Sequence, residues 1–295
     1  MGHVSRRDFL RAGLGTAALA GASRSLSAFA PQRSATDWVA LGDSGVKVTR
    51  LALGTGTYGG RVQRELGQEA FTSLVRHAYD RGIRFFETAE GYTGMPEMLG
   101  IALKGLPRDS YRLMTKFSER GDLQAKMDRA RTALNTDYFD ILLMHCMRSP
   151  TWADDGKAMR DGLSEAKSKK ILMAHGASCH GLQALGSLPG DKWLDVALVR
   201  MNHKGVRMDT PSMNDTNDLG DVPQVVAQAK KVRAQGTGIL SMKLVGEGQF
   251  TNADDREAAL KFVLGQGLAD AVTIGYKSPA EIDEAIERAD RALNA

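Results

Sequence analysis

The sequence predicts an α/β fold, a (β/α)8 TIM barrel, in which eight parallel strands alternate with helices around one core. Three observations lead to this fold class. Eight short apolar runs recur along the chain, a helical pattern separates them, and no linker interrupts the alternation after residue 35. The runs are short and unbroken, as is typical of strands buried on both faces. With 42% hydrophobic residues, the 295-residue chain has enough apolar surface for one large core.

The eight apolar runs define the expected barrel strands. They are Leu51–Gly54, Ile83–Glu87, Arg112–Lys116, Asp140–Met144, Ile171–His175, Asp195–Arg200, Ile239–Lys243 and Ala271–Gly275. Before the first run, "VALGDSGVKVTR" has the pattern of a β-hairpin with Asp43, Ser44 and Gly45 at its turn. We expect this N-terminal hairpin to close the bottom of the barrel.

The segments between the runs have the periodicity and end signals of helices. In "QEAFTSLVRHAYDRG" four apolar residues share one face, and Gly82 is placed to end the helix. Asp122 is a candidate N-cap for the helix that follows the third strand. Pro279 stands near the start of the last helix, where a missing N–H is tolerated.

A dinucleotide-binding doubly wound fold is the rival interpretation. "GTGTYG", Gly54–Gly59, matches G-x-G-x-x-G after an expected strand, and Glu87 at the next strand end is a candidate for holding a ribose. In that motif a helix begins directly at the third glycine. Here no helical pattern begins until several residues after Gly59. Eight alternations also exceed what a six-stranded doubly wound domain uses, so we favour the barrel.

The first thirty residues form a separate segment. "SRRDFLR", Ser5 to Arg11, resembles the twin-arginine export signal of bacteria, and an apolar stretch and the A-x-A-like Ala28–Ala30 follow it. We expect a signal peptide over 1–30, the barrel over 31–295, engagement of the twin-arginine translocation machinery, and a periplasmic or otherwise exported protein. An amphipathic helix or a disordered arm is the alternative. The apolar stretch is too short and glycine-rich to span a bilayer stably.

Charge gives little support for a nucleic-acid partner. Four arginines against one aspartate in residues 1–30 contribute +3, which leaves +1 of the net charge of +4 for the remainder.

Four chemistry-bearing side chains stand at the ends of adjacent strands or just beyond. Glu87 ends the second strand, Tyr92 follows it, Lys116 ends the third, and His145 comes just after the fourth. Chemistry in such barrels gathers at these carboxyl ends. An ammonium favours phenolate and lowers the pKa of a tyrosine, and an imidazole can orient a carbonyl. This set can protonate a carbonyl oxygen, but no side chain donates hydride, so a nicotinamide cofactor is required.

These motifs resemble those of the aldo-keto reductase family over nearly the whole chain after residue 37. "VKVTRLALGTGTYGG" is similar to the family's opening strand, "GIRFFETAEGY" to its Asp-Thr-Ala-x-x-Tyr motif, "LMTKF" to its lysine motif and "FDILLMH" to its histidine motif. The resemblance implies that Tyr92 is the general acid and that Lys116, paired with Glu87, lowers its pKa. It implies that His145 orients a small carbonyl substrate and that NADP(H) or NAD(H) is the cofactor.

The resemblance also implies a set of cofactor-binding positions. They are Gly54, Thr55, Ser178, Cys179, Lys243, Leu244, Gly275, Lys277 and Ser278. Several residues depart from the family pattern, since Glu87 replaces an aspartate, Ser178-Cys179 a Ser-Asn pair and Leu198 a glutamine. Lys243 stands where many members have serine, and the adenosine contacts are replaced by Glu281 and Glu284-Ala285.

Other features of the sequence bear on the function and on the cysteines. Eroded cofactor contacts leave open an exported barrel that binds a ligand without redox turnover. Cys146 and Cys179 follow neighbouring strands and are candidates for a disulfide. His175 and His180 lie near these cysteines, but no ligand spacing supports a metal site, so we expect none. We interpret Glu90 as a solvated loop charge that is not directed at Lys116.

Overall fold

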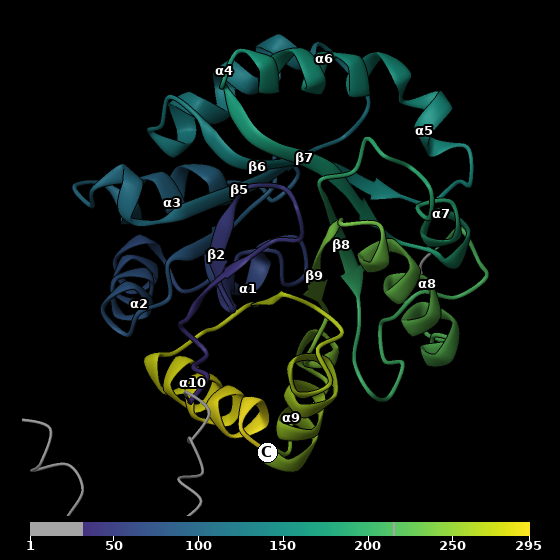
Figure 1. Ribbon diagram of the computed structural model, residues 1–295. Helices are drawn as coiled ribbons and strands as arrows, with labels where there is room; N and C mark the ends of the chain where they lie inside the picture. Colours follow the sequence, from purple (N-terminus) through teal and green to yellow (C-terminus); the bar gives the residue numbers. More distant parts are fainter. Residues whose placement is uncertain (1–31, 215) are drawn as a thin grey trace, which may run out of the picture. The chain divides into compact units, whose positions relative to one another are not determined.

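The computed structural model describes residues 32–214 and 216–295, and Arg33–Ala295 form one compact unit (Figure 1). The expected signal segment, residues 1–30, lies outside the described residues. Across the described part of the chain, no helix is both long enough and apolar enough to cross a membrane.

Within the described residues, eight parallel strands close into a barrel in the order β10-β3-β4-β5-β6-β7-β8-β9. The strands are β3 Leu51–Gly54, β4 Phe85–Glu87, β5 Arg112–Phe117, β6 Phe139–Met147, β7 Leu172–Cys179, β8 Val196–Arg200, β9 Gly238–Met242 and β10 Ala271–Ile274. The pairing of β9 with β10 completes the circle. The predicted fold class and its eight strands are confirmed, and the doubly wound alternative is wrong because the sheet has no open edge.

The N-terminal hairpin packs against the bottom of the barrel, as predicted. Its strands are β1 Trp38–Ala40 and β2 Lys47–Thr49, paired antiparallel. Leu41 and Val48 are fully buried and belong to the same apolar cluster as the inward-facing strand residues. Gly42 forms a bridge with Thr237, just before β9, so the hairpin covers the amino ends of the strands. The opposite, carboxyl end of the strands is not covered by this hairpin.

Helices surround the barrel (Figure 1). They are α1 Arg61–Arg64, α2 Gln68–Asp80, α3 Met95–Leu103, α4 Leu123–Leu134, α5 Trp152–Asp155, α6 Lys157–Ser168, α7 Leu182–Gly186, α8 Val222–Ala234, α9 Ala253–Leu260 and α10 Pro279–Leu293. Short turns are η1 Arg108–Ser110, η2 Gly246–Gly248 and the π-helical η3 Lys261–Gly265.

The predicted helix signals act as expected. The buried face of α2 consists of the four apolar residues that the sequence pattern placed together. The Asp122 side chain accepts a hydrogen bond from the backbone N–H of Ala125 and so caps α4. Gly82 follows α2 with a positive φ of 96°, a left-handed conformation that glycine adopts without strain.

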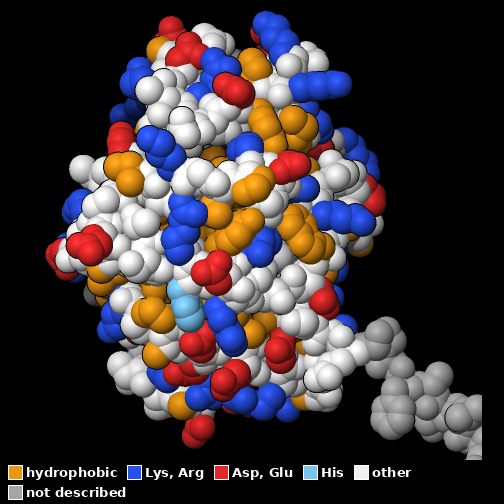
Figure 2. All heavy atoms as spheres, turned by 90° about the vertical axis from the view of Figure 1, so that its left-hand side faces the viewer, with side chains coloured by type: hydrophobic (Ala, Val, Ile, Leu, Met, Phe, Trp, Pro, Cys, Tyr) orange, Lys and Arg blue, Asp and Glu red, His pale blue; other side chains and the backbone are white. Residues whose placement is uncertain are grey.

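The core has two layers. A larger layer lies between the sheet and the helices, and a smaller one fills the barrel interior. On the face shown in Figure 2, basic and acidic side chains are interspersed.

Candidate active site

The carboxyl ends of neighbouring strands bring the predicted side chains together. Glu87 is the last residue of β4, and Lys116 and His145 lie near the ends of β5 and β6. Tyr92 lies in the loop after β4, and its partly buried ring lies beside Lys116 and His145. All four predicted catalytic residues therefore share one site.

Lys116 and Glu87 form a buried ion pair. The Lys116 ammonium donates to Glu87 Oε1 and to the backbone oxygen of Thr88, the latter at 2.8 Å. Glu87 Oε2 accepts from Thr273 Oγ1 at 3.2 Å. Lys116 is 1% exposed and Glu87 4% exposed, so little water screens the pair. The longer side chain of glutamate thus reaches the lysine, as the sequence interpretation required.

Gly54 provides the space for this carboxylate. A Cβ at Gly54 would lie 2.8 Å from Glu87 Oε2 and 2.4 Å from Thr273 Oγ1, closer than carbon and oxygen atoms approach in proteins. Gly56 does the same for the phenol, because its Cβ would lie 2.6 Å from the Tyr92 hydroxyl. The first two glycines of "GTGTYG" are therefore explained by room for site side chains.

The ring of Tyr92 lies close to the Lys116 amine and to the His145 imidazole. Lys116 Nζ lies 4.9 Å from the centre of the Tyr92 ring. The His145 ring packs edge-on at 5.6 Å between centroids, and His180 packs edge-on against His145 at 6.2 Å. One phenol, one ammonium and two imidazoles thus converge where a small carbonyl group can be held.

Burial controls the protonation states of the site. It raises the pKa of Tyr92, and Cys146 and Glu247 add to the rise. It lowers the pKa of His145 to about 3, with a further contribution from Lys116. Burial and then Lys243 lower the pKa of Lys116, whereas its contact with Glu87 favours the ammonium.

The expected lowering of the Tyr92 pKa is wrong for the protein as the structure shows it. Burial, which disfavours the charged phenolate, is the largest cause of the shift, and the nearby Lys116 ammonium is paired with Glu87. The phenol is therefore protonated at neutral pH, and the imidazole of His145 is neutral.

The interpretation of Glu90 as a solvated charge is also wrong. Its carboxylate accepts from the backbone N–H of Ser118 at 2.6 Å, from the Ser118 hydroxyl and from Lys126 Nζ at 2.9 Å. The backbone N–H of Glu90 donates to the Lys116 carbonyl at 3.0 Å. Glu90 therefore does not contact the Lys116 ammonium, but it fastens the loop that carries Tyr92 to the end of β5.

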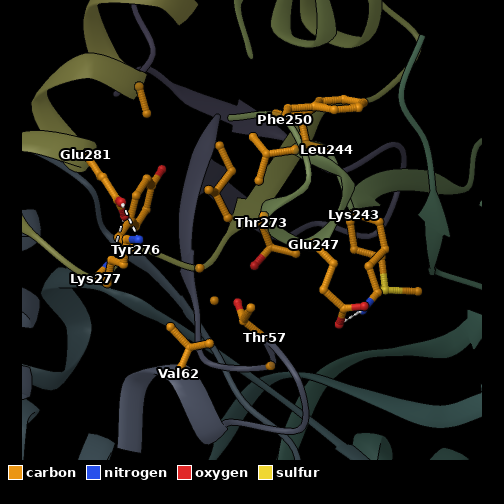
Figure 3. A pocket seen from close by; sticks show the side chains of 18 of the residues that line it. Thr57, Val62, Lys243, Leu244, Glu247, Phe250, Thr273, Tyr276, Lys277 and Glu281 are labelled. Carbon is orange, nitrogen blue, oxygen red and sulfur yellow. Dashed lines mark hydrogen bonds and ion pairs between the residues drawn. The ribbon is translucent and has the colours of Figure 1, made fainter. Parts of the chain in front are cut away.

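A cavity of about 680 Å³ opens beside Tyr92 (Figure 3). Lys243 and Glu247 lie on one side of the view, and Tyr276, Lys277 and Glu281 lie on the opposite side. Five predicted cofactor positions line this cavity: Gly54, Lys243, Leu244, Gly275 and Lys277. Four of the departures from the family pattern line it as well: Leu198, Glu281, Glu284 and Ala285.

The other four predicted cofactor positions are not among the cavity-lining residues. The Thr55 hydroxyl donates to Thr88 Oγ1 at 3.0 Å, and Ser178 Oγ accepts from the Cys146 N–H at 2.9 Å. Cys179 is fully buried in the outer core layer. The Ser278 hydroxyl caps α10 by accepting from the Glu281 N–H at 3.3 Å. In the structure, these four residues are engaged in contacts within the protein.

His180 is the side chain that the sequence interpretation missed. It lines the cavity, and burial, Arg200 and His145 lower its pKa, so the imidazole is neutral. Its Nδ1 is buried without a hydrogen-bond partner. The sequence signal for it is its place directly after Ser178-Cys179, at the carboxyl end of β7.

The described residues show neither a disulfide between the two cysteines nor a cluster of metal ligands. No disulfide joins Cys146 and Cys179, although Met147, the residue after Cys146, is in register with Cys179. Among residues 32–214 and 216–295, no group of three or more His, Cys, Asp or Glu side chains is arranged to hold a metal ion.

The residues present fit a nicotinamide dinucleotide in size and placement. The cavity volume lies within the range of about 300–1,000 Å³ typical of cofactor sites. One part of the cavity borders Tyr92, and another borders the amino end of α10. Lys243 and Lys277 also line it, each in contact with a glutamate.

Comparison with known proteins points to one family. The model of the aldo/keto reductase family matches residues 50–266. The chain is 29% identical to the Glycine max protein named Probable aldo-keto reductase 1, over 46% of this chain and 47% of that protein. It is 35% identical to L-galactose dehydrogenase of Arabidopsis thaliana over 36% of each chain. The matches thus span about half or less of these relatives.

Solved structures show the same fold. A candidate aldo-keto reductase from Pseudomonas aeruginosa superimposes with a TM-score of 0.70 and 22% identity, covering 88% of this chain and 98% of that one.

Proposed function

Because the chain belongs to the aldo/keto reductase family, we propose that it is an oxidoreductase that reduces an aldehyde or ketone with a nicotinamide cofactor. Tyr92 is the general acid in this proposal. The observation that carries it is the convergence of Tyr92, Lys116 and His145 beside a cavity of cofactor size. When bound, the dihydronicotinamide supplies the hydride that no side chain can give.

The side chains perform the proton chemistry. The raised pKa keeps Tyr92 protonated, as a proton donor must be before reaction. When the phenol gives its proton to the carbonyl oxygen, Lys116 stabilises the phenolate from 4.9 Å above the ring. The neutral imidazoles of His145 and His180 have N–H groups available to hydrogen-bond the same oxygen and orient the carbonyl.

The test has two steps. The protein is first titrated with NADH and NADPH, and binding below millimolar levels is expected. Turnover of simple aldehydes and ketones is then compared for the wild type and Tyr92→Phe. General acids contribute about 10²- to 10⁴-fold, so kcat should fall by that order while cofactor affinity stays nearly constant. Tyr276→Phe is the matched control, because it removes a cavity-lining phenol whose hydroxyl has no hydrogen-bond partner.

The binding-protein alternative is separated by the same titration. If the protein binds neither dinucleotide at millimolar concentration, the result contradicts the reductase proposal and favours a ligand-binding barrel. Equal turnover of Tyr92→Phe and wild type contradicts the role of Tyr92 alone.

We propose in addition that residues 1–30 direct export by the twin-arginine pathway, on the strength of "SRRDFLR" alone. Cell fractionation of the wild type and of Arg6→Lys/Arg7→Lys tests this. The wild type should be found outside the cytoplasm and the variant inside it, whereas an unchanged distribution contradicts the proposal.

A further inference from the structure

The basic side chains at the α10 end of the cavity are already paired with carboxylates. Arg256 Nε lies 2.7 Å from Glu284 Oε1, and Arg288 Nε lies 2.8 Å from the same oxygen. Lys277 Nζ lies 3.8 Å from Glu281 Oε1, and the backbone N–H of Lys277 donates to Glu281 Oε2 at 2.9 Å. The two glutamates therefore contact all three of these cations.

Further contacts hold this pairing in place. Arg288 also contacts Glu257 at 2.6 Å, so its guanidinium bridges two carboxylates. Arg256 also donates to the backbone oxygens of Phe250 and Thr251, at 3.1 and 2.8 Å. Each guanidinium thus has several acceptors, and presenting it to another anion means giving up those bonds.

The opposite side of the cavity repeats the arrangement. Lys243 donates to the carboxylate of Glu247, which also accepts from the backbone N–H of Tyr58 at 3.3 Å. Among the cavity-lining residues that the structure describes, the four cations Lys243, Arg256, Lys277 and Arg288 each contact at least one carboxylate. None of these four side chains is thus left without a carboxylate partner.

This pairing bears on which of the two nicotinamide dinucleotides the cavity can bind. They differ by a ribose 2′-phosphate, and such a phosphate adds about −1.5 to −2 charges near pH 7. Recognising it takes arginine or lysine side chains that are not already neutralised. A carboxylate repels a phosphate, but it accepts hydrogen bonds from free ribose hydroxyl groups.

We infer that this cavity selects NAD(H) over NADP(H), with Glu281 and Glu284 as the specificity-determining residues. The inference rests on the proposed function for the identity of the cofactor. It deepens that function because the family comparison leaves the choice of dinucleotide open.

The experiment measures dissociation constants by calorimetry on the full chain. NADH is compared with NADPH, and 5′-AMP with 2′,5′-ADP. The second pair measures the effect of the 2′-phosphate on binding in ligands that lack nicotinamide. In each pair the ligand without the 2′-phosphate should bind at least about tenfold more tightly, a difference of about 1.4 kcal/mol. Glu284→Gln, which removes a carboxylate partner of Arg256 and Arg288, and Glu281→Gln should each reduce that preference severalfold. Glu287→Gln is the control, since it removes the same charge from an exposed position of α10.

Equal or tighter binding of the phosphorylated ligands by the wild type overturns the inference, as does a preference that both variants leave unchanged. Absence of binding by all four ligands overturns it together with the proposed function. NADPH preference with Tyr92-dependent turnover refutes only the inference. NADH preference without turnover of any carbonyl refutes only the proposed function.

Discussion

The buried pair of Glu87 and Lys116 gives the sharpest stability prediction. Glu87→Gln keeps the volume of the side chain and its ability to accept from Thr273, but it removes the negative charge. The Lys116 ammonium, 1% exposed, then has no counter-charge in contact. Since no cavity forms, the change isolates the electrostatic part of the interaction.

The expected cost is large compared with total stability. Breaking a buried ion pair by removing one partner costs about 3–5 kcal/mol, of a total free energy of unfolding of about 5–15 kcal/mol. The cost should shrink as pH rises from 7 towards the ordinary lysine pKa of 10.5. In that window the unfolded chain holds the Lys116 proton more tightly than the folded variant, so stability rises with pH.

Urea unfolding of four proteins measures this directly. They are the wild type, Glu87→Gln, Lys116→Met and the double variant, which removes both charges. The double variant should be more stable than Glu87→Gln, because it leaves no unpaired buried charge. A loss below about 1 kcal/mol for Glu87→Gln at pH 7, or losses that simply add in the double variant, would refute the reasoning.

Three further predictions follow from the site geometry. His145 has a folded pKa of about 3 against an ordinary value of 6.5, so the stability it contributes should be lost as pH falls from 6.5 towards 3, by about 1.4 kcal/mol per unit. His145→Asn should flatten that stretch of the pH–stability curve, and an unchanged slope contradicts the assignment. Gly56→Ala places a methyl group 2.6 Å from the Tyr92 hydroxyl and should lower kcat by about 10²-fold, whereas Gly91→Ala meets no atom within 4 Å and should not. Equal kcat values for these two variants contradict the packing argument. Glu90→Gln loosens the loop that carries Tyr92, so kcat should fall severalfold with the cofactor dissociation constant unchanged. A shift in the dissociation constant alone would contradict this role of Glu90.

The barrel could be predicted because its signals are local. Each strand is a short apolar run, and α2 shows its buried face as a run of apolar residues at helical spacing. The register of the strands is not local, and β6 illustrates this. It extends through Met147 with an irregularity after Met144 and a positive φ of 68° at Cys146, which no residue pattern indicated.

The site was predicted only in part, for a related reason. Glu87, Tyr92, Lys116 and His145 follow from strand ends, because parallel strands deliver their carboxyl ends to one face. The bonds of Glu90 depend on Ser118 and on other residues far along the chain. The pKa of Tyr92 depends on how deeply the loop is buried, which spacing alone does not reveal.

The most direct test of the central claim is the deuterium content of the product alcohol. NADH and NADPH deuterated at the nicotinamide C4 are supplied in turn with an aldehyde, and the alcohol is analysed by mass spectrometry. The account predicts one deuterium on the carbinol carbon with wild-type protein and a yield about 10²- to 10⁴-fold lower with Tyr92→Phe. Absence of deuterated alcohol with both cofactors, over a panel of aldehydes and ketones, would contradict it.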